Sequence, residues 1–98
     1  MLSIKLSDGF EFEADSVNEI YDGHTKTSNL NIRCQSAPGE ASAVRKHITP
    51  ENVKHIVVML DGEAIEEYAG YGEIVSVDKI ITKFERTLNV RLKKEDKV

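Results

Sequence analysis

The chain has 98 residues, a net charge of −4, 40% hydrophobic residues and a single cysteine. This composition indicates one globular domain and excludes overall disorder. The lone cysteine excludes an internal disulfide framework, no apolar run has the length of a membrane span, and the acidic balance argues against general nucleic-acid binding. The N-terminus lacks the basic and apolar regions of a signal peptide, so we expect a cytoplasmic or virion-associated protein.

Apolar and polar residues alternate over 2–6 and again over 10–14, which predicts two half-buried strands. A three-residue loop over 7–9 would place Ile4 opposite Phe12 and keep every apolar side chain on one face. We therefore predict a bulged turn whose glycine takes the left-handed conformation.

Residues 15–29 become polar and turn-forming, and we expect a bend or an irregular strand that leads into a loop. Alternation over 30–35 then predicts a strand with Cys34 facing the core. A weak apolar stripe over 39–48 predicts a helix that begins near Ser36 and Pro38. Thr49 and Pro50 together predict one short helical turn over 50–54.

The segment 55–69 predicts a second hairpin, which turns at Asp61-Gly62. Its apolar run 57–60 does not alternate, so we expect both faces of that strand to be covered. For the same reason the pattern does not choose between loop lengths, and the register stays open.

Gly70 and Gly72 flank Tyr71 and predict a bend of the sheet. Residues 74–81 predict a strand broken near Asp78, and residues 83–86 predict a turn. The last strand, over 88–92, has a basic face, which is typical of a protected sheet edge.

The chain thus predicts an α+β fold of mainly antiparallel β hairpins, with about seven short strands and one or two short helices. We expect a single domain over 1–93 and a frayed tail over 94–98. The two Asp-Gly hairpins echo each other, but no repeat has a fixed period.

Two stretches carry a resemblance: Ile4–Ser16, with its opening hairpin, and Leu60–Tyr71, which ends in a Tyr-x-Gly-Tyr pattern. Together they resemble small uncharacterised proteins of phages and prophages of Gram-positive bacteria. The resemblance implies a phage-linked origin and a structural or accessory role. It implies no activity and no functional residues.

The sequence predicts no catalytic residue, no cofactor and no metal site. His24, His47 and His55 lack the close spacing of metal ligands, and Cys34 sits at an inward position of its strand. Glu66 and Glu67 are neighbours on a strand and should point to opposite faces, so they do not form a paired acid and base. An enzyme would need a pocket that contains Cys34 or two of the histidines.

Tyrosines and exposed acids are the remaining candidates for an interaction surface. Tyr21, Tyr68 and Tyr71 are open to two interpretations, packing at a sheet edge or anchoring an interface. Residues 61–78 carry six acidic residues and no basic one, whereas residues 79–98 carry seven basic residues. The predicted interaction residues are Glu63, Glu66, Glu67, Tyr68 and Tyr71.

We therefore expect a non-enzymatic protein–protein interaction module that binds a protein partner or self-associates through strand edges. It would bind neither nucleic acid nor membrane. The alternative is an acidic inhibitor-type protein that occupies a basic, nucleic-acid-binding site on a host protein.

Overall fold

The computed structural model describes residues 1–35, 40–83 and 86–94, which form eight strands and one helix. The fold is therefore mainly β, with more strands and less helix than the sequence predicts. The element bounds are Leu2–Lys5 (β1), Glu11–Glu13 (β2), Ser16–Asp22 (β3), Thr27–Gln35 (β4), Glu40–His47 (α1), His55–Leu60 (β5), Glu63–Ala69 (β6), Glu73–Ile81 (β7) and Arg86–Lys93 (β8).

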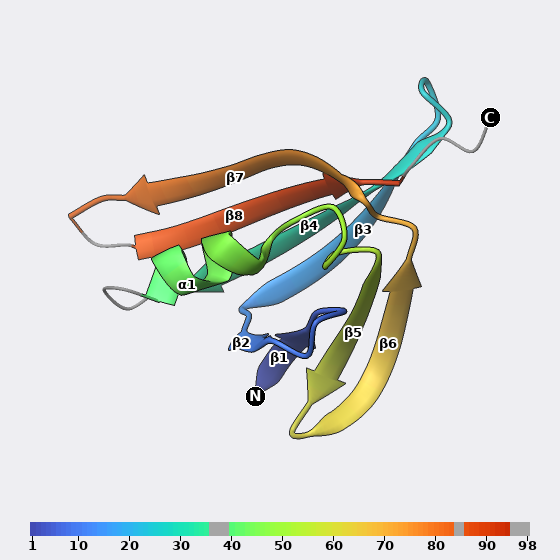
Figure 1. Cartoon of the computed structure of the whole chain (residues 1–98). Coiled ribbons are helices and arrows are strands. Elements are labelled where there is room, and N and C mark those ends of the chain that lie inside the picture. Colours follow the sequence, from blue (N-terminus) through green and yellow to red (C-terminus); the bar gives the residue numbers. More distant parts are fainter. Residues whose placement is uncertain (36–39, 84–85, 95–98) are drawn as a thin grey trace.

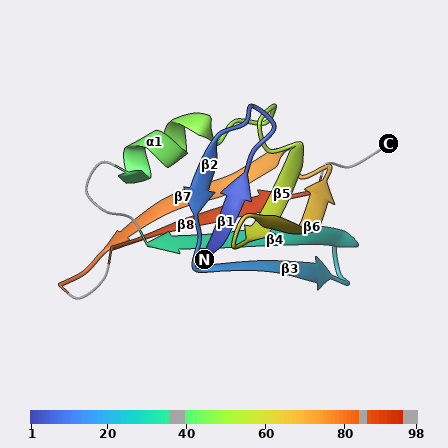
Figure 2. The same ribbon diagram turned by 90° about the horizontal axis from the view of Figure 1, so that it is seen from below.

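The strands form two antiparallel sheets of four strands each. Sheet A has the order β2-β1-β5-β6 and sheet B the order β3-β4-β8-β7. Figures 1 and 2 show the strands of sheet A crossing those of sheet B, with one face of each sheet turned toward the other. Alternate residues of β4 and β8 are fully buried between the sheets, because successive strand side chains point to opposite faces. These buried residues are Leu30, Ile32, Cys34, Leu88, Val90 and Leu92.

The first hairpin has the predicted register. Ile4 is opposite Phe12, and Lys5 is opposite Glu11. The backbone N–H of Leu6 donates to the Phe10 carbonyl at 2.9 Å, so the loop covers residues 7–9. Gly9 has φ +91°, which confirms the left-handed position.

The second hairpin turns through a two-residue loop, which settles the register that the sequence left open. Asp61 has φ 51° and Gly62 has φ 85°, the two positive angles of a type I′ turn. The register shifts between Val58 and Met59, so that Ile65 has no partner on β5 and forms a bulge. The expectation of two covered faces is wrong for β5, because Leu60 is 46% exposed and the burial along the strand alternates.

Three further sequence-based predictions differ from the structure of sheet B. The segment expected as a bend is a regular seven-residue strand, β3, which pairs with β4 along its whole length. The break in β7 is a bulge at Val75 instead of an interruption near Asp78. β8 lies between β4 and β7, so it is an interior strand and not an edge. Alternation along one strand reports a buried face but not which strands lie beside it.

The helix and the short turn lie where they were predicted. α1 buries Val44, and the following Ile48 is also buried, so the apolar stripe faces the core. The Thr49 hydroxyl accepts the N–H of Asn52 at 3.3 Å and caps the turn that follows. Ser36 and Pro38, the predicted start of the helix, lie outside the described residues, as do residues 84–85 of the turn expected over 83–86 and residues 95–98 of the expected tail.

The two halves of the chain have the same arrangement of strands. Strands β1–β4 and strands β5–β8 each contribute one hairpin to sheet A and one to sheet B. The halves meet where β1 pairs with β5 and where β4 pairs with β8. The two Asp-Gly turns occupy equivalent places, between β1 and β2 and between β5 and β6. The echo between these hairpins in the sequence therefore reflects a repeated four-strand topology.

Candidate functional site

The predicted acidic residues lie on β6, an edge strand of sheet A, and their side chains are exposed. Glu66 is opposite the buried Val58 and Glu67 is opposite Val57, so the two carboxylates leave the sheet on different faces, as predicted. Within the described ranges no cation lies within ion-pair distance of Glu63, Glu66 or Glu67.

The two predicted tyrosines form the corner where the chain leaves sheet A for sheet B. The rings of Tyr68 and Tyr71 meet edge to face, with centroids 6.1 Å apart. The Tyr68 hydroxyl donates to the Glu66 carboxylate and the Tyr71 hydroxyl donates to the Glu19 carboxylate. The second bond joins the corner to β3, so it ties the two sheets together.

Tyr71 has a packing role. Tyr71 is 1% exposed and packs in the interior, whereas Tyr68 is half-buried. Burial, together with hydrogen bonds to carboxylates, raises the pKa of both tyrosines to about 12. Both hydroxyls therefore remain protonated donors at neutral pH.

The third tyrosine, Tyr21, is the exposed one. It lies on β3, an edge strand of sheet B, beside Ile20. Tyr21 is 65% exposed and Ile20 is 51% exposed. The pairing of β3 with β4 is regular throughout, so no bulge protects this edge. The sequence did not reveal the edge, because its polar residues resembled those of a loop.

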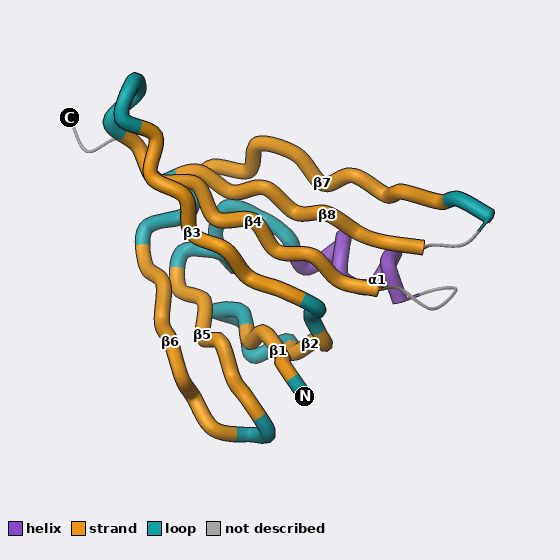
Figure 3. Tube along the Cα trace, turned by 180° about the vertical axis from the view of Figure 1, so that it is seen from behind, coloured by secondary structure: helices purple, strands orange, loops and turns teal. Residues whose placement is uncertain are grey.

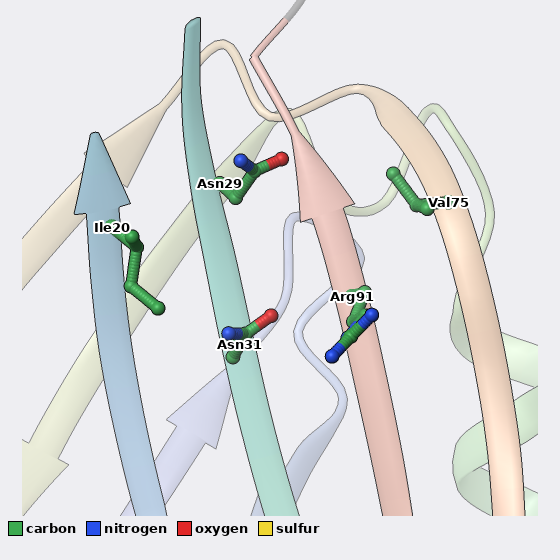
Figure 4. A pocket seen from close by; sticks show the side chains of 5 residues that line it. All are labelled: Ile20, Asn29, Asn31, Val75 and Arg91. Carbon is green, nitrogen blue, oxygen red and sulfur yellow. The ribbon is translucent and has the colours of Figure 1, made fainter. Parts of the chain in front are cut away.

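A hollow of about 260 Å³ opens on the outer face of sheet B, the face turned away from sheet A. Figure 3 views the molecule from this side, with α1 behind the sheet. The hollow is lined by residues of all four strands, Ile20, Asn29, Asn31, Val75 and Arg91. Figure 4 shows these five side chains, with Asn31 and Arg91 on adjacent central strands.

Two lining residues have unused hydrogen-bonding capacity. The Asn31 Oδ1 atom is buried and accepts no hydrogen bond from the described residues. Arg91, directly opposite Asn31 in the register, has no ion pair with any described residue. The sequence did not indicate this site, because the polar residues of β4 and β8 match those of a solvated face.

The histidines and Cys34 lie apart. His47 packs on the Phe10 ring, with centroids 3.9 Å apart, and its Nδ1 lies 2.7 Å from Asp8 Oδ2. Cys34 is buried, and burial raises the pKa of its thiol to about 11, which disfavours a nucleophilic thiolate. Among the described residues no group of His, Cys, Asp and Glu side chains is arranged to hold a metal ion.

No protein-family model, curated protein or solved structure matches the chain. In the part of the chain that the structure describes, no helix has the length and apolar character that a membrane span requires.

Proposed function

We propose that the protein is a non-enzymatic interaction module that self-associates through β3. The observation that carries the proposal is a regular strand with one free edge, on which Ile20 and Tyr21 are exposed on opposite faces of the sheet. An edge strand presents free N–H and C=O groups to a second strand, and tyrosine is common at interface hot spots. The resemblance to phage proteins supports a structural or accessory role.

The occupant of this edge is the β3 strand of a second copy. Pairing β3 with β7 of another copy is a head-to-tail contact that gives a ring or an open filament, whereas pairing β3 with itself gives a closed, two-fold dimer. The β7 edge also carries the Val75 bulge, which interrupts its ladder. The β6 edge carries exposed acids and a bulge, and β2 has only three residues.

Charge selects the register of this antiparallel pair. A pair centred on Glu19 would place two carboxylates opposite each other. A pair centred on Ile20 places Glu19 opposite Tyr21 and Asn18 opposite Asp22, so no like charges meet. The dimer would then contain one continuous eight-stranded sheet made from both copies of sheet B.

Introducing a negative or a positive charge at Tyr21 tests both the use of the β3 edge and the proposed register of the pair. Tyr21→Glu would face Glu19 of the second copy twice in each dimer, so we expect a monomer by sedimentation velocity. Tyr21→Lys would face the same carboxylate and should remain dimeric. Ile81→Glu, at an exposed position on the opposite edge, is the control and should also remain dimeric. Undiminished association of Tyr21→Glu would contradict the proposal.

One observation favours a second candidate, the acidic inhibitor. Glu63, Glu66 and Glu67 project from β6 without a cation beside them in the described ranges. Such a protein would occupy a basic site, so DNA should compete with it and added salt should weaken the complex steeply. Reversal of the three charges to lysine should abolish binding, and a complex that tolerates both salt and reversal would exclude this candidate.

A further inference from the structure

The hollow on sheet B is lined by polar groups from the two central strands and apolar groups from the two edge strands. Asn29 and Asn31 come from β4 and Arg91 comes from β8, the two central strands (Figure 4). Ile20 and Val75 come from the two edge strands and are both about half exposed. A small number of polar groups within an apolar boundary is the usual composition of a small-molecule site.

Two polar groups of the lining lack protein partners that a ligand could supply. A buried acceptor without a donor is costly, and the Asn31 Oδ1 atom is such an acceptor. The Arg91 guanidinium, a planar group suited to two parallel bonds with a carboxylate, forms no ion pair with any described residue. The site therefore calls for one anionic acceptor and one neutral donor.

These requirements exclude several chemical classes of ligand. None of the five lining residues is acidic, so the ammonium group of an amino acid would lie beside Arg91 without a counter-charge. Arg91 is the only cation of the lining, so a phosphate dianion would be poorly neutralised. A carboxylate with hydroxyl groups close by meets both needs, since a hydroxyl can donate to Asn31 Oδ1 and accept from an asparagine amide.

We propose that this hollow binds a hydroxylated monocarboxylate of monosaccharide size, such as a uronic acid. The carboxylate pairs with Arg91, and the ring hydroxyls bond Asn31 and Asn29. The volume of about 260 Å³ suits one sugar unit and lies just below the usual range of drug-sized pockets. The hollow opens on the face of sheet B, and it shares Ile20 with the proposed β3 pair.

The test is a ¹H–¹⁵N NMR titration of the full chain with glucuronate, and with glucose as the matched neutral sugar. Glucuronate should shift the amide signals of the five lining residues, and glucose should bind roughly tenfold more weakly or worse, since it lacks the charge-assisted bonds. Arg91→Gln should weaken glucuronate binding to a similar degree. Arg45→Gln, at an exposed position on α1, is the control and should bind as the wild type does.

Three results would overturn the site. One is equal binding of glucose and glucuronate, because recognition would then not depend on the carboxylate. Another is unchanged glucuronate binding in a folded Arg91→Gln protein, with folding checked from the dispersion of the amide signals. The third is the absence of any change in the amide signals at tens of millimolar glucuronate, which would mean that only water hydrogen-bonds to Asn31.

Discussion

Cys34 lies on the inner face of β4 with 3% of its surface exposed. Burial is the main cause of its raised pKa, and the negative charge of Asp15 adds to it. The thiol thus contributes to packing as a small apolar group, and it would become a nucleophile only if the sheet opened.

The rate at which a thiol reagent labels Cys34 tests whether the thiol is buried. At about pH 8, the fraction of thiolate should be roughly a hundredfold smaller in the folded protein, with a pKa of about 11, than at the ordinary value of 9.0. Labelling should be slow until urea unfolds the chain. Because the folded pKa is raised, the stabilisation from the neutral thiol is complete below pH 9 and is lost as the pH rises toward 11. Rapid labelling of the native protein would contradict the burial of Cys34.

Asp8 shows the opposite shift. Its Oδ1 accepts the Phe10 N–H at 3.0 Å and its Oδ2 lies 2.7 Å from His47, so its pKa falls below 3.8, chiefly through the Phe10 bond. Because the pKa of Asp8 is lower in the folded chain than in the unfolded chain, its carboxylate stabilises the fold when the pH is above 3.8, the unfolded pKa. This stabilisation is lost as the pH falls from 3.8 toward the folded pKa. Asp8→Asn should therefore be less stable than the wild type near neutral pH, by urea denaturation, and the difference should shrink in acid.

Asp78→Asn is the control for this measurement, because the Asp78 side chain is exposed and forms no hydrogen bond with a described residue. Its stability should match that of the wild type near neutral pH. A destabilisation of Asp8→Asn that does not change with pH would show that the carboxylate charge is not what matters.

At the scale of single residues, alternation predicted which side chains are buried, including Cys34. It could not separate the roles of the tyrosines. Tyr71 is buried because its hydroxyl reaches Glu19 on a strand 52 positions earlier, and no local pattern reports such a bond. The pairing of Asn31 with Arg91 is likewise a contact between distant strands.

At the scale of secondary-structure elements, the two hairpins show how much of a strand register the sequence predicts. The first register followed from its apolar alternation. The second depends on Asp61 and Gly62, both with positive φ, which fit a two-residue loop. The bulge at Ile65 then shifts the pairing, a feature that the unbroken apolar run of β5 conceals.

Gly62→Ala tests the second turn. An alanine at φ +85° costs about 1 kcal/mol, so the urea midpoint should fall without a change in the m-value. Gly23→Ala is the matched control, since Gly23 lies outside the positive-φ range and no atom lies within 4 Å of its added Cβ. We expect it to be neutral or slightly stabilising. Equal losses in the two variants would argue against the type I′ turn.

At the scale of the whole molecule, the sequence predicted antiparallel hairpins but not how they combine. The decisive pairings join β1 to β5 and β4 to β8, across the two halves of the chain. These pairings make β8 an interior strand and leave β3 as an edge. Each half of the chain thus completes the sheets of the other, and the β3 pair that we propose would extend sheet B into a second copy in the same way.

Light scattering of the wild-type protein over a concentration series tests this self-association most directly. A closed β3–β3 pair predicts that the mass rises from one chain toward two chains with increasing concentration and then stays there, because the two-fold pair uses up both edges. A mass of one chain that persists at high micromolar concentration would contradict the account, as would a mass that keeps growing beyond two chains.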